Sequence, residues 1–233
     1  MKFRRFIVAA GLWGWAALAH AQFSSTIGVV SDYDFRGISL SARDPALQVS
    51  ADYAFGETGF SAGVFASNID SGPDVDGDLE TDVYVDFATM FNDRFGFNAG
   101  ATYYTYPGSD GTEAFPEAYV GLVAGDFVVN QWFTHDYLGV GDTALYTEAN
   151  YSRELPASFS LSVHAGYSYG AAFEDAELFD YFAELGYTWN DIFFAVRFTG
   201  TDASGELKVT DDVFNNEPRF LLSISTTLPW DED

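Results

Sequence analysis

The chain has 233 residues, with 35 acidic against 10 basic side chains and a formal net charge of −25. So few basic residues exclude an extended basic surface for nucleic acid, and the absence of cysteine excludes a disulfide framework and a thiolate metal site. An acidic soluble domain and a membrane protein both remain open, and the order of residues along the chain has to separate them.

The first 21 residues have the pattern of a secretory signal peptide. The opening "MKFRR" is basic, "FIVAAGLWGWAALA" is apolar, and "AHA" at positions 19–21 is an A-x-A cleavage site. A retained anchor helix fits less well, because the apolar run is short and ends in that cleavage pattern. We expect residues 1–21 to be a signal peptide and residues 22–233 to form one mature domain. Three basic residues and no acid lie in the signal, so the mature charge would be 7 − 35 = −28.

Residues 23–36 alternate between apolar and polar side chains, which is the period of a β-strand. Tyr33 and Phe35 fall on the mostly apolar face, and Asp32, Asp34 and Arg36 fall on the polar face. If the strand crosses a bilayer, the apolar face has to meet lipid and the polar face has to meet the interior. We therefore predict that Tyr33 and Phe35 face lipid near a headgroup level, and that the three charged residues face a lumen near its outer mouth.

The same alternation recurs along the rest of the chain. It is clear over residues 45–55, 80–91, 95–106, 114–124, 144–154, 158–170, 178–189, 192–200 and 219–228, and less regular over 59–69 and 127–137. In the last of these segments His135 cannot be assigned to a face. The pattern predicts twelve strands, most of them longer than the five or six residues that are usual in soluble proteins. A length of about 9–11 residues is what a tilted strand needs to cross a bilayer.

The connections between these strands alternate in length. Tight turns are expected at 56–59, 92–94, 125–126, 154–157 and 190–191, whereas the other connections, such as 71–80, 107–113 and about 200–218, are longer and rich in Asp, Gly and Ser. An even number of strands with short turns on one rim and long loops on the other predicts an all-β fold. The expected fold is a closed antiparallel up-and-down transmembrane β-barrel of about 12 strands, with both termini on the periplasmic rim. A soluble sandwich would leave the signal peptide and the loop alternation unexplained.

The first third of the chain carries a more specific signature. It has the form S-x-Y-x-F-R-G-x-S, D-P-A-x-Q, D-Y and G-F-x-x-G-x-x-x-S-N, here Ser31, Tyr33, Phe35, Arg36, Gly37, Ser39, Asp44, Pro45, Ala46, Gln48, Asp52, Tyr53, Gly59, Phe60, Gly63, Ser67 and Asn68. These residues resemble the start of the TorF-like porins of the Gcw_chp type. The resemblance implies a small porin-like β-barrel in the outer membrane of a Gram-negative bacterium.

Barrels of this kind usually end on an aromatic residue that the barrel assembly machinery reads. This chain continues past Leu228 to Trp230 and three acidic residues. Either Trp230 takes that role or the tail lies beyond the last strand.

The polar faces of the predicted strands are strongly acidic. The candidate pore-lining residues are Asp32, Asp34, Arg36, Asp52, Asp82, Asp86, Glu117, Glu148, His164, Asp180, Glu184 and Arg197. Carboxylates that line a channel favour cations, so we predict a porin-like channel for passive diffusion of small polar or cationic solutes, with outer-membrane lipid and the barrel assembly machinery as its other partners. Alternatively, these acids form a network that plugs the barrel, and the protein acts as a scaffold or a surface-binding protein through its acidic loops.

Other functions have weaker support in the sequence. Ser162 and His164 share a strand face, but this spacing alone does not activate a nucleophile, and neither a G-x-S-x-G nor an H-E-x-x-H motif is present. We therefore expect no enzyme, no cofactor and no transition-metal site. The acidic stretch 70–82 has some likeness to a calcium-binding loop but lacks its bidentate glutamate. A solvated loop is the preferred interpretation there.

Overall fold

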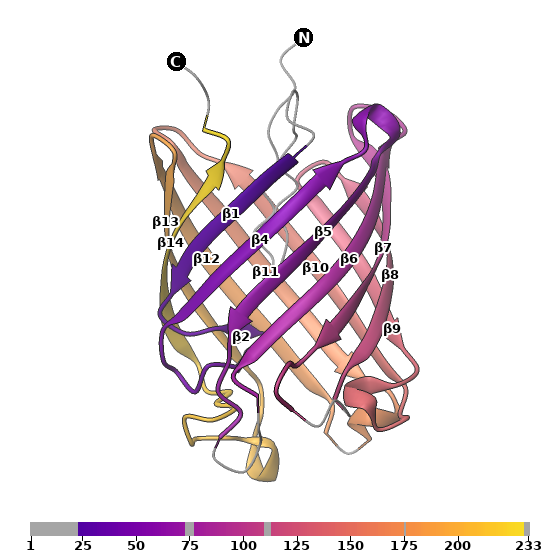
Figure 1. Cartoon of the computed structure of the whole chain (residues 1–233), viewed down its shortest axis with the longest axis vertical. Helices are drawn as coiled ribbons and strands as arrows, with labels where there is room; N and C mark the ends of the chain where they lie inside the picture. The colour runs from indigo at the N-terminus through magenta and orange to yellow at the C-terminus, as the bar shows by residue number, and fades with distance from the viewer. Residues whose placement is uncertain (1–22, 73–76, 110–112, 175, 231–233) are drawn as a thin grey trace.

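The computed structural model describes residues 23–72, 77–109, 113–174 and 176–230. The expected signal peptide, 1–21, lies outside these residues. Twelve strands of the described part close into an antiparallel barrel (Figure 1). They are β1 Phe23–Val30, β4 Ala46–Ala54, β5 Phe60–Asn68, β6 Leu79–Met90, β7 Phe95–Thr105, β8 Phe115–Ala124, β9 Phe127–Thr134, β10 Ala144–Glu154, β11 Phe159–Tyr169, β12 Leu178–Trp189, β13 Ile192–Thr201 and β14 Arg219–Leu228.

Every barrel strand pairs with its two neighbours around the ring. β1 pairs with β4 on one side and with β14 on the other, where Ile27 lies opposite Thr226 and closes the sheet. Closure leaves no free sheet edge, so the backbone groups of the wall are paired without water. The predicted closed barrel of about 12 strands is therefore confirmed.

Side-chain alternation gives the barrel an apolar exterior. Outward residues such as Val83, Leu122 and Phe220 are 60%, 64% and 73% exposed, whereas the inward Tyr84 and Tyr119 are buried. An apolar surface that continues around the whole wall would be very unfavourable in water. It matches what a barrel presents to lipid hydrocarbon.

The two rims differ as the connection lengths predict (Figure 1). The short turns, including the single helical turn η1 Gly56–Thr58, lie on the rim where β1 begins and β14 ends. The opposite rim carries the long loops, with the helical turns η2 Tyr137–Gly139, η3 Ala171–Phe173 and η4 Gly205–Leu207. None of the helices in the described ranges is long and apolar enough to cross a membrane.

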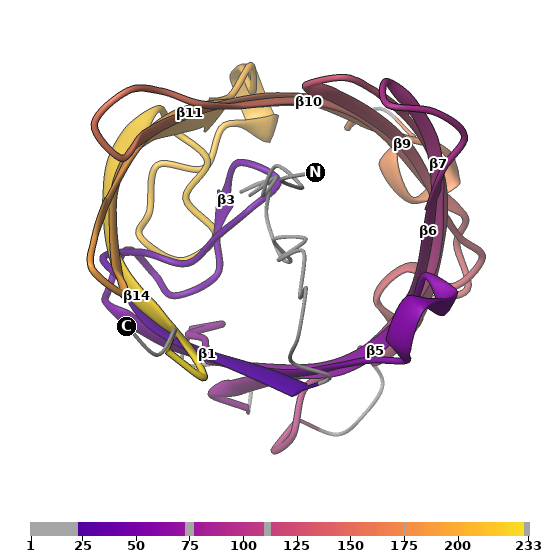
Figure 2. The ribbon, with the colours of Figure 1, turned by 90° about the horizontal axis from the view of Figure 1, so that it is seen from above.

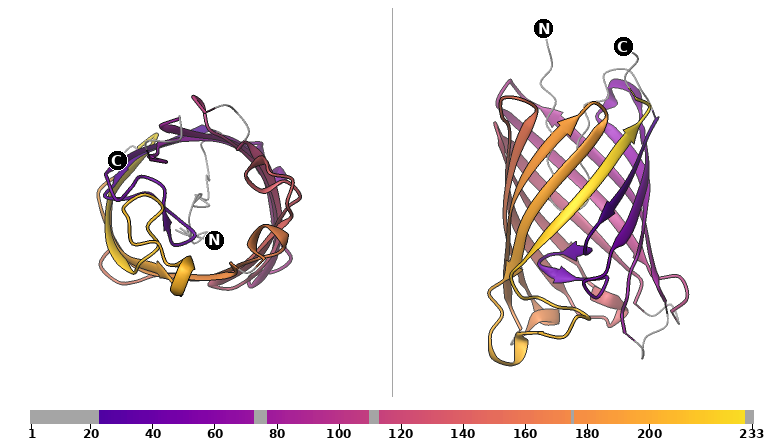
Figure 3. Two further views of the ribbon diagram at one scale, coloured as in Figure 1. Left: turned by 90° about the horizontal axis from the view of Figure 1, so that it is seen from below. Right: turned by 90° about the vertical axis from the view of Figure 1, so that its left-hand side faces the viewer.

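The first long connection departs from the prediction. β1 ends at Val30, and residues 31–45, here called the inserted loop, turn into the barrel and form the small hairpin β2 Asp34–Phe35 and β3 Ile38–Ser39. Views along the barrel axis show this hairpin inside the ring of strands (Figures 2 and 3).

The prediction that Tyr33 and Phe35 face lipid is therefore wrong. The Tyr33 side chain is only 3% exposed and packs edge-on against Phe65, and Phe35 packs against Tyr104. The periodic pattern continues past the strand because β2 is also extended. The turn that reverses the chain depends on Gly37, whose φ of +80° favours glycine.

Candidate functional site: a lumen divided by the inserted loop

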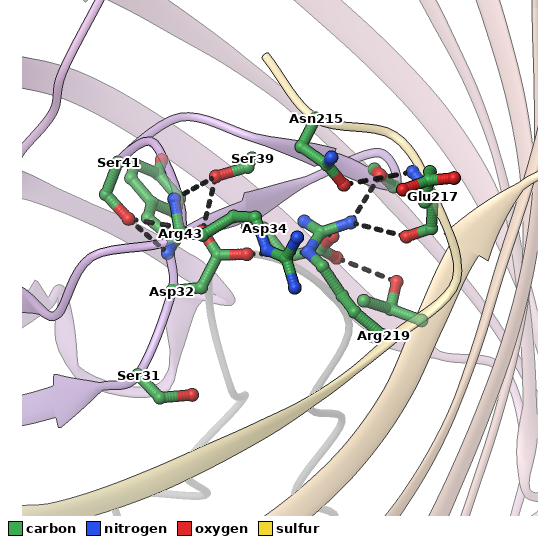
Figure 4. A network of polar contacts seen from close by, with 12 residues as sticks. Ser31, Asp32, Asp34, Ser39, Ser41, Arg43, Asn215, Glu217 and Arg219 are labelled. Carbon is green, nitrogen blue, oxygen red and sulfur yellow. Dashed lines mark hydrogen bonds and ion pairs between the residues drawn. The ribbon is translucent and has the colours of Figure 1, made fainter. Parts of the chain in front are cut away.

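One arginine of the barrel wall holds the base of the inserted loop (Figure 4). The Nε of Arg219, at the start of β14, donates to Asp32 Oδ2 at 2.6 Å, its Nη2 donates to Asp34 Oδ1 at 2.8 Å, and its Nη1 donates to the Gly37 carbonyl at 2.9 Å. Arg219 and Asp32 are both buried. Burial raises the pKa of the Asp34 carboxyl, and the Arg219 guanidinium opposes this shift. A charged network of this kind is stable only when each member is paired.

Hydroxyl groups within the loop add to the contacts that Arg219 makes with its base. Asp32 Oδ1 accepts hydrogen bonds from Ser39 Oγ at 2.5 Å and from Ser41 Oγ at 3.2 Å. The Ser39 amide donates to the Asn215 carbonyl at 2.8 Å, which joins the hairpin to the outer loop between β13 and β14. Ser39 and Gly37, which belong to the signature in the first third of the chain, thus help to stabilise the fold of this loop.

Side chains on the opposite side of the loop reach the far wall of the barrel. The Arg36 guanidinium makes a two-pronged ion pair with Glu117 on β8, at 2.6 and 3.2 Å. The Tyr33 hydroxyl donates to Glu80 on β6 at 2.5 Å. Burial opposes the charge on Arg36, but the Glu117 carboxylate together with the Tyr104 and Tyr146 hydroxyls outweighs this effect, so the pKa of Arg36 lies above its ordinary value. The loop therefore spans the lumen from β14 to β6 and β8.

An aromatic cluster narrows the same level of the barrel. Tyr104 stacks on Phe115 with ring centroids 4.8 Å apart, and Phe115 meets Tyr137 at 5.2 Å. Tyr137 in turn lies 5.1 Å from Phe173. These rings and the inserted loop lie in the half of the lumen next to the long loops, here called the long-loop half.

In the half next to the short turns, here called the short-turn half, tyrosines lie against the wall. Tyr84 on β6 is paired across the strands with Gly63 on β5, which is paired with Asp52 on β4. A methyl group added at Gly63 would overlap the Tyr84 ring, whose hydroxyl donates to Asp52. The absence of a side chain on Gly63 therefore lets the ring lie flat along the wall.

The same arrangement repeats two strands further around the barrel. Tyr119 on β8 is paired with Gly100 on β7, which is paired with Asp86 on β6. The Tyr119 hydroxyl donates to Asp86 Oδ1 at 2.7 Å. In both rows a glycine accommodates the ring, and the hydroxyl orients a lumen carboxylate without neutralising it. The rings therefore stay close to the wall and out of the central space.

The wall from β9 to β12 combines aromatic rings, an imidazole and carboxylates. Trp132 Nε1 donates to Glu148 Oε1 at 2.9 Å. His164 Nε2 lies 2.9 Å from Asp180 Oδ1 and 2.9 Å from the Tyr146 hydroxyl. The imidazole stacks on Phe182 with centroids 4.8 Å apart. The network fixes these groups in place, so their charges act from defined positions.

Two cavities adjoin the inserted loop. One of about 300 Å³ lies on its short-turn side, and its polar lining includes Asp34, Asp52, Glu184 and Arg197. A smaller one of about 40 Å³ lies between Arg36 and the β9–β13 wall and includes Glu148 and Asp180 in its lining. Both are lined by acidic side chains of the predicted set.

The structure brings the candidate residues together around one lumen. All twelve lie on the inserted loop or on inward positions of the strands, namely Asp32, Asp34, Arg36, Asp52, Asp82, Asp86, Glu117, Glu148, His164, Asp180, Glu184 and Arg197. Arg36, Asp32 and Asp34 are carried by the loop and not by a wall strand. Whether the set lines a conducting pore stays a prediction.

Two lumen residues were missing from the predicted set. Arg219 lies on the same face as Ser223 and Ser225, so extending the alternation of the last strand to its first residue would have found it. Glu80 was assigned to an acidic loop, although it shares a face with Asp82 on β6 and is buried. The predicted strand segments 219–228 and 80–91 already contained both residues, but neither residue was assigned to the polar face of its strand.

The structure also shows the surroundings of the residues considered for catalysis, metal binding and barrel assembly. Ser162 Oγ lies 3.3 Å from Ser152 Oγ, whereas the partners of His164 are Tyr146, Asn150 and Asp180. In the acidic stretch 70–82, Asp74 and Asp76 lie outside the described residues. No group of three or more His, Cys, Asp or Glu side chains suited to a metal occurs in the described part of the chain. Trp230 follows β14 and its Nε1 donates to Thr226 Oγ1 at 2.8 Å; its role in assembly stays a prediction.

The fold is a closed antiparallel barrel of twelve strands, and it is similar to that of solved outer-membrane porins. The solved KdgM porin is similar, with a TM-score of 0.57 and 12% identity over 87% of this chain and 98% of that one. A KdgM porin in complex with disordered oligogalacturonate has a TM-score of 0.53 and 11% identity, over 88% of this chain and 97% of that one. The NanC porin has a TM-score of 0.55 and 13% identity, over 88% and 98%. At sequence identities this low, the similarity shows that the folds are alike and nothing about function.

Residues 16–228 match the Gcw_chp family, which is described as a bacterial protein of unknown function, and the chain belongs to this family. That part of the expected resemblance is confirmed, while the TorF-like name stays a prediction. No curated protein matches the chain.

Proposed function

We propose that the protein is an outer-membrane channel that lets small cationic or polar solutes diffuse through an acidic lumen. The observation that carries the proposal is the imbalance of charge inside the barrel. Arg36, Arg197 and Arg219 each pair with a carboxylate, at 2.6–2.8 Å. The carboxylates of Asp52, Asp86, Glu148 and Asp180 accept hydrogen bonds from tyrosine, tryptophan, amide or imidazole groups instead.

Uncompensated carboxylates lower the energy of a cation in the lumen and raise that of an anion. The low-dielectric wall strengthens this effect, because it confines the field lines to the water-filled space. The KdgM porin has been solved with oligogalacturonate. We infer that the acidic lumen of the present chain disfavours anionic oligosaccharides of that kind.

The apolar exterior supports a location in the outer membrane. Its exposed aromatic residues include Phe23, Phe60 and Trp189, all close to the short-turn rim. Aromatic side chains at the ends of strands are typical of the interfaces of a bilayer. The expected signal peptide would supply the export that such a location requires.

A liposome-swelling assay with the refolded mature chain tests the channel. Solutes of equal size but different charge are compared, for example a small sugar, its amino derivative and its acidic derivative. We expect fastest uptake of the amino compound and slowest uptake of the acid. Equal rates for all three, or fastest entry of the acid, would overturn the charge argument.

A second candidate function is a closed barrel that acts through its outer loops. The observation favouring it is the inserted loop, which spans the lumen between Arg219 and Glu117. Absence of swelling by a barrel shown to be inserted and heat-modifiable would favour this alternative over the channel.

A further inference from the structure

The tip of the inserted loop places a guanidinium group in a cage of wall residues. Arg36 makes its two-pronged ion pair with Glu117, and its guanidinium carbon lies 4.0 Å from the ring centroid of Tyr146 and 5.9 Å from that of Trp132. Phe35, in the loop itself, lies at 4.8 Å. We call Glu117, Trp132 and Tyr146 the guanidinium cage. Its members come from three neighbouring strands, β8, β9 and β10.

The cage suits a guanidinium group better than an ammonium group. A guanidinium is flat, so it can stack on an aromatic face and present two parallel N–H groups to one carboxylate at the same time. An ammonium is compact and strongly hydrated, and it cannot make the paired contact with Glu117. Glu117 is 1% exposed, so the paired contact takes place away from bulk water, where a cation–π contact also gains strength.

The wall repeats this chemistry beyond the cage. Arg197 lies over the Phe182 ring at 4.0 Å and pairs with Glu184 at 2.8 Å. Between the two arginines, the 40 Å³ cavity is lined by aromatic rings and by Glu148 and Asp180. One carboxylate oxygen of Asp180 is buried and has no hydrogen-bond partner among the described residues. A flat cation that entered this region would meet the same pair of groups, an aromatic face and a carboxylate, at successive positions.

We propose that the guanidinium cage is a recognition site for small solutes that carry a guanidinium group, and that Arg36 is a tethered occupant which such a solute replaces at Glu117. The passage of these solutes rests on the proposed channel function, whereas their binding does not. A group on a short tether competes at an effective concentration on the order of millimolar. Free guanidinium therefore binds the cage more weakly in the native chain than in a variant without Arg36.

The test measures binding in detergent micelles, where no conduction is needed. Trp189 and Trp230 are replaced by Phe, so that Trp132 is the one tryptophan left in the mature chain. Its fluorescence is titrated with guanidinium chloride and with methylammonium chloride, at constant ionic strength and at concentrations too low to denature the barrel. In Arg36→Ala, we expect guanidinium to bind about tenfold more tightly than methylammonium, which corresponds to about 1.4 kcal/mol.

Matched variants separate the cage from general effects of charge. Arg43→Ala removes the exposed arginine of the same loop and should retain the weak binding of the native chain. The double variant Arg36→Ala/Glu117→Gln keeps the aromatic rings but should lose the preference for guanidinium. If Arg36→Ala does not give a heat-modifiable barrel, Arg36→Lys serves in its place, because it vacates the two-pronged site while leaving a charge in the loop.

Two results would overturn the inference. One is equal affinity for guanidinium and methylammonium in both Arg36 variants, and the other is a preference that persists after Glu117→Gln. A folded protein that binds guanidinium but conducts no ions would contradict the channel and leave the cage intact. A conducting channel without any guanidinium preference would contradict the cage alone.

Discussion

The carboxylates of the lumen fall into two groups with different partners. On the inserted loop and the wall that it touches, Asp32, Asp34 and Glu117 pair with arginines. In the short-turn half, Asp52 and Asp86 accept hydrogen bonds from tyrosine hydroxyls. The first group is held by two arginines, one of which is shared by Asp32 and Asp34, and it fixes the loop. The second group is oriented by neutral hydroxyl donors, and in the proposed channel it supplies the electrostatic field of the lumen.

This difference shows that the partner decides what an acidic residue contributes. Removing one member of a buried ion pair leaves an uncompensated charge and costs about 3–5 kcal/mol. Losing a neutral hydrogen bond costs about 1 kcal/mol. We therefore expect substitutions in the first group to change the structure, and substitutions in the second to change selectivity with little change in stability.

The largest effect is expected for Arg219→Ala. It leaves Asp32 and Asp34 buried without their shared partner, at a cost of about 3–5 kcal/mol. The inserted loop should detach from β14, and single-channel conductance should rise severalfold with more current noise. Unchanged conductance together with an unchanged thermal transition would show that Arg219 does not hold the loop.

A smaller effect is expected for Gly100→Val, which tests whether glycine lets the tyrosine ring lie flat along the wall. A side chain at this position overlaps the Tyr119 ring and the Asp86 carboxylate. Overpacking of this kind costs about 1–3 kcal/mol, and the displaced ring should narrow the lumen and lower conductance. Ala101→Val on the same strand is the control, because Ala101 faces outward and is exposed. If both variants behaved alike, the ring would not depend on the glycine.

The double variant Asp52→Asn/Asp86→Asn should change selectivity more than stability. In water, a carboxylate about 8 Å from a permeating cation contributes about 0.5 kcal/mol, or roughly twofold in permeability. Each carboxylate raises the energy of an anion by a similar amount, so we expect the ratio of cation to anion permeability to fall by roughly sixteenfold at low salt, and by less at 1 M salt because of screening. The thermal transition is measured in parallel, and a ratio that did not change would place the selective field elsewhere.

The smallest effect is expected for the exposed ion pair that Arg43 of the inserted loop makes with Asp212. Arg43 and Asp212 lie 3.7 Å apart with side chains 46% and 72% exposed. Exposed pairs of this kind contribute about 0.5 kcal/mol or less. Arg43→Ala should therefore leave the thermal transition and the conductance close to those of the native chain, in contrast to Arg219→Ala. A loss of stability as large as that of Arg219→Ala would remove the distinction between buried and exposed pairs.

Much of the fold could be read from the sequence because a lipid-facing barrel imposes a strict period of two. Val83 and Val85 on one face of β6, with Asp82 and Asp86 on the other, follow directly from alternation. The rims could be predicted for a similar reason, since short turns and long loops have different compositions.

The inserted loop could not be predicted, because alternation does not distinguish a wall strand from an extended hairpin inside the lumen. Asp32, Asp34 and Arg36 alternate with Tyr33 and Phe35 in both arrangements. What separates the two is the pairing of Arg219 with residues almost the whole chain length away. Such a contact depends on closure of the barrel, which brings β14 beside β1.

The proposed preference of the lumen for cations depends on carboxylate charge that is not neutralised. The most direct test is the reversal potential of the refolded mature chain in a planar bilayer under a gradient of potassium chloride at low ionic strength. We expect discrete current steps and a reversal potential displaced toward that of potassium. A reversal potential at zero or displaced toward chloride, from a protein shown to be folded and inserted, would contradict it.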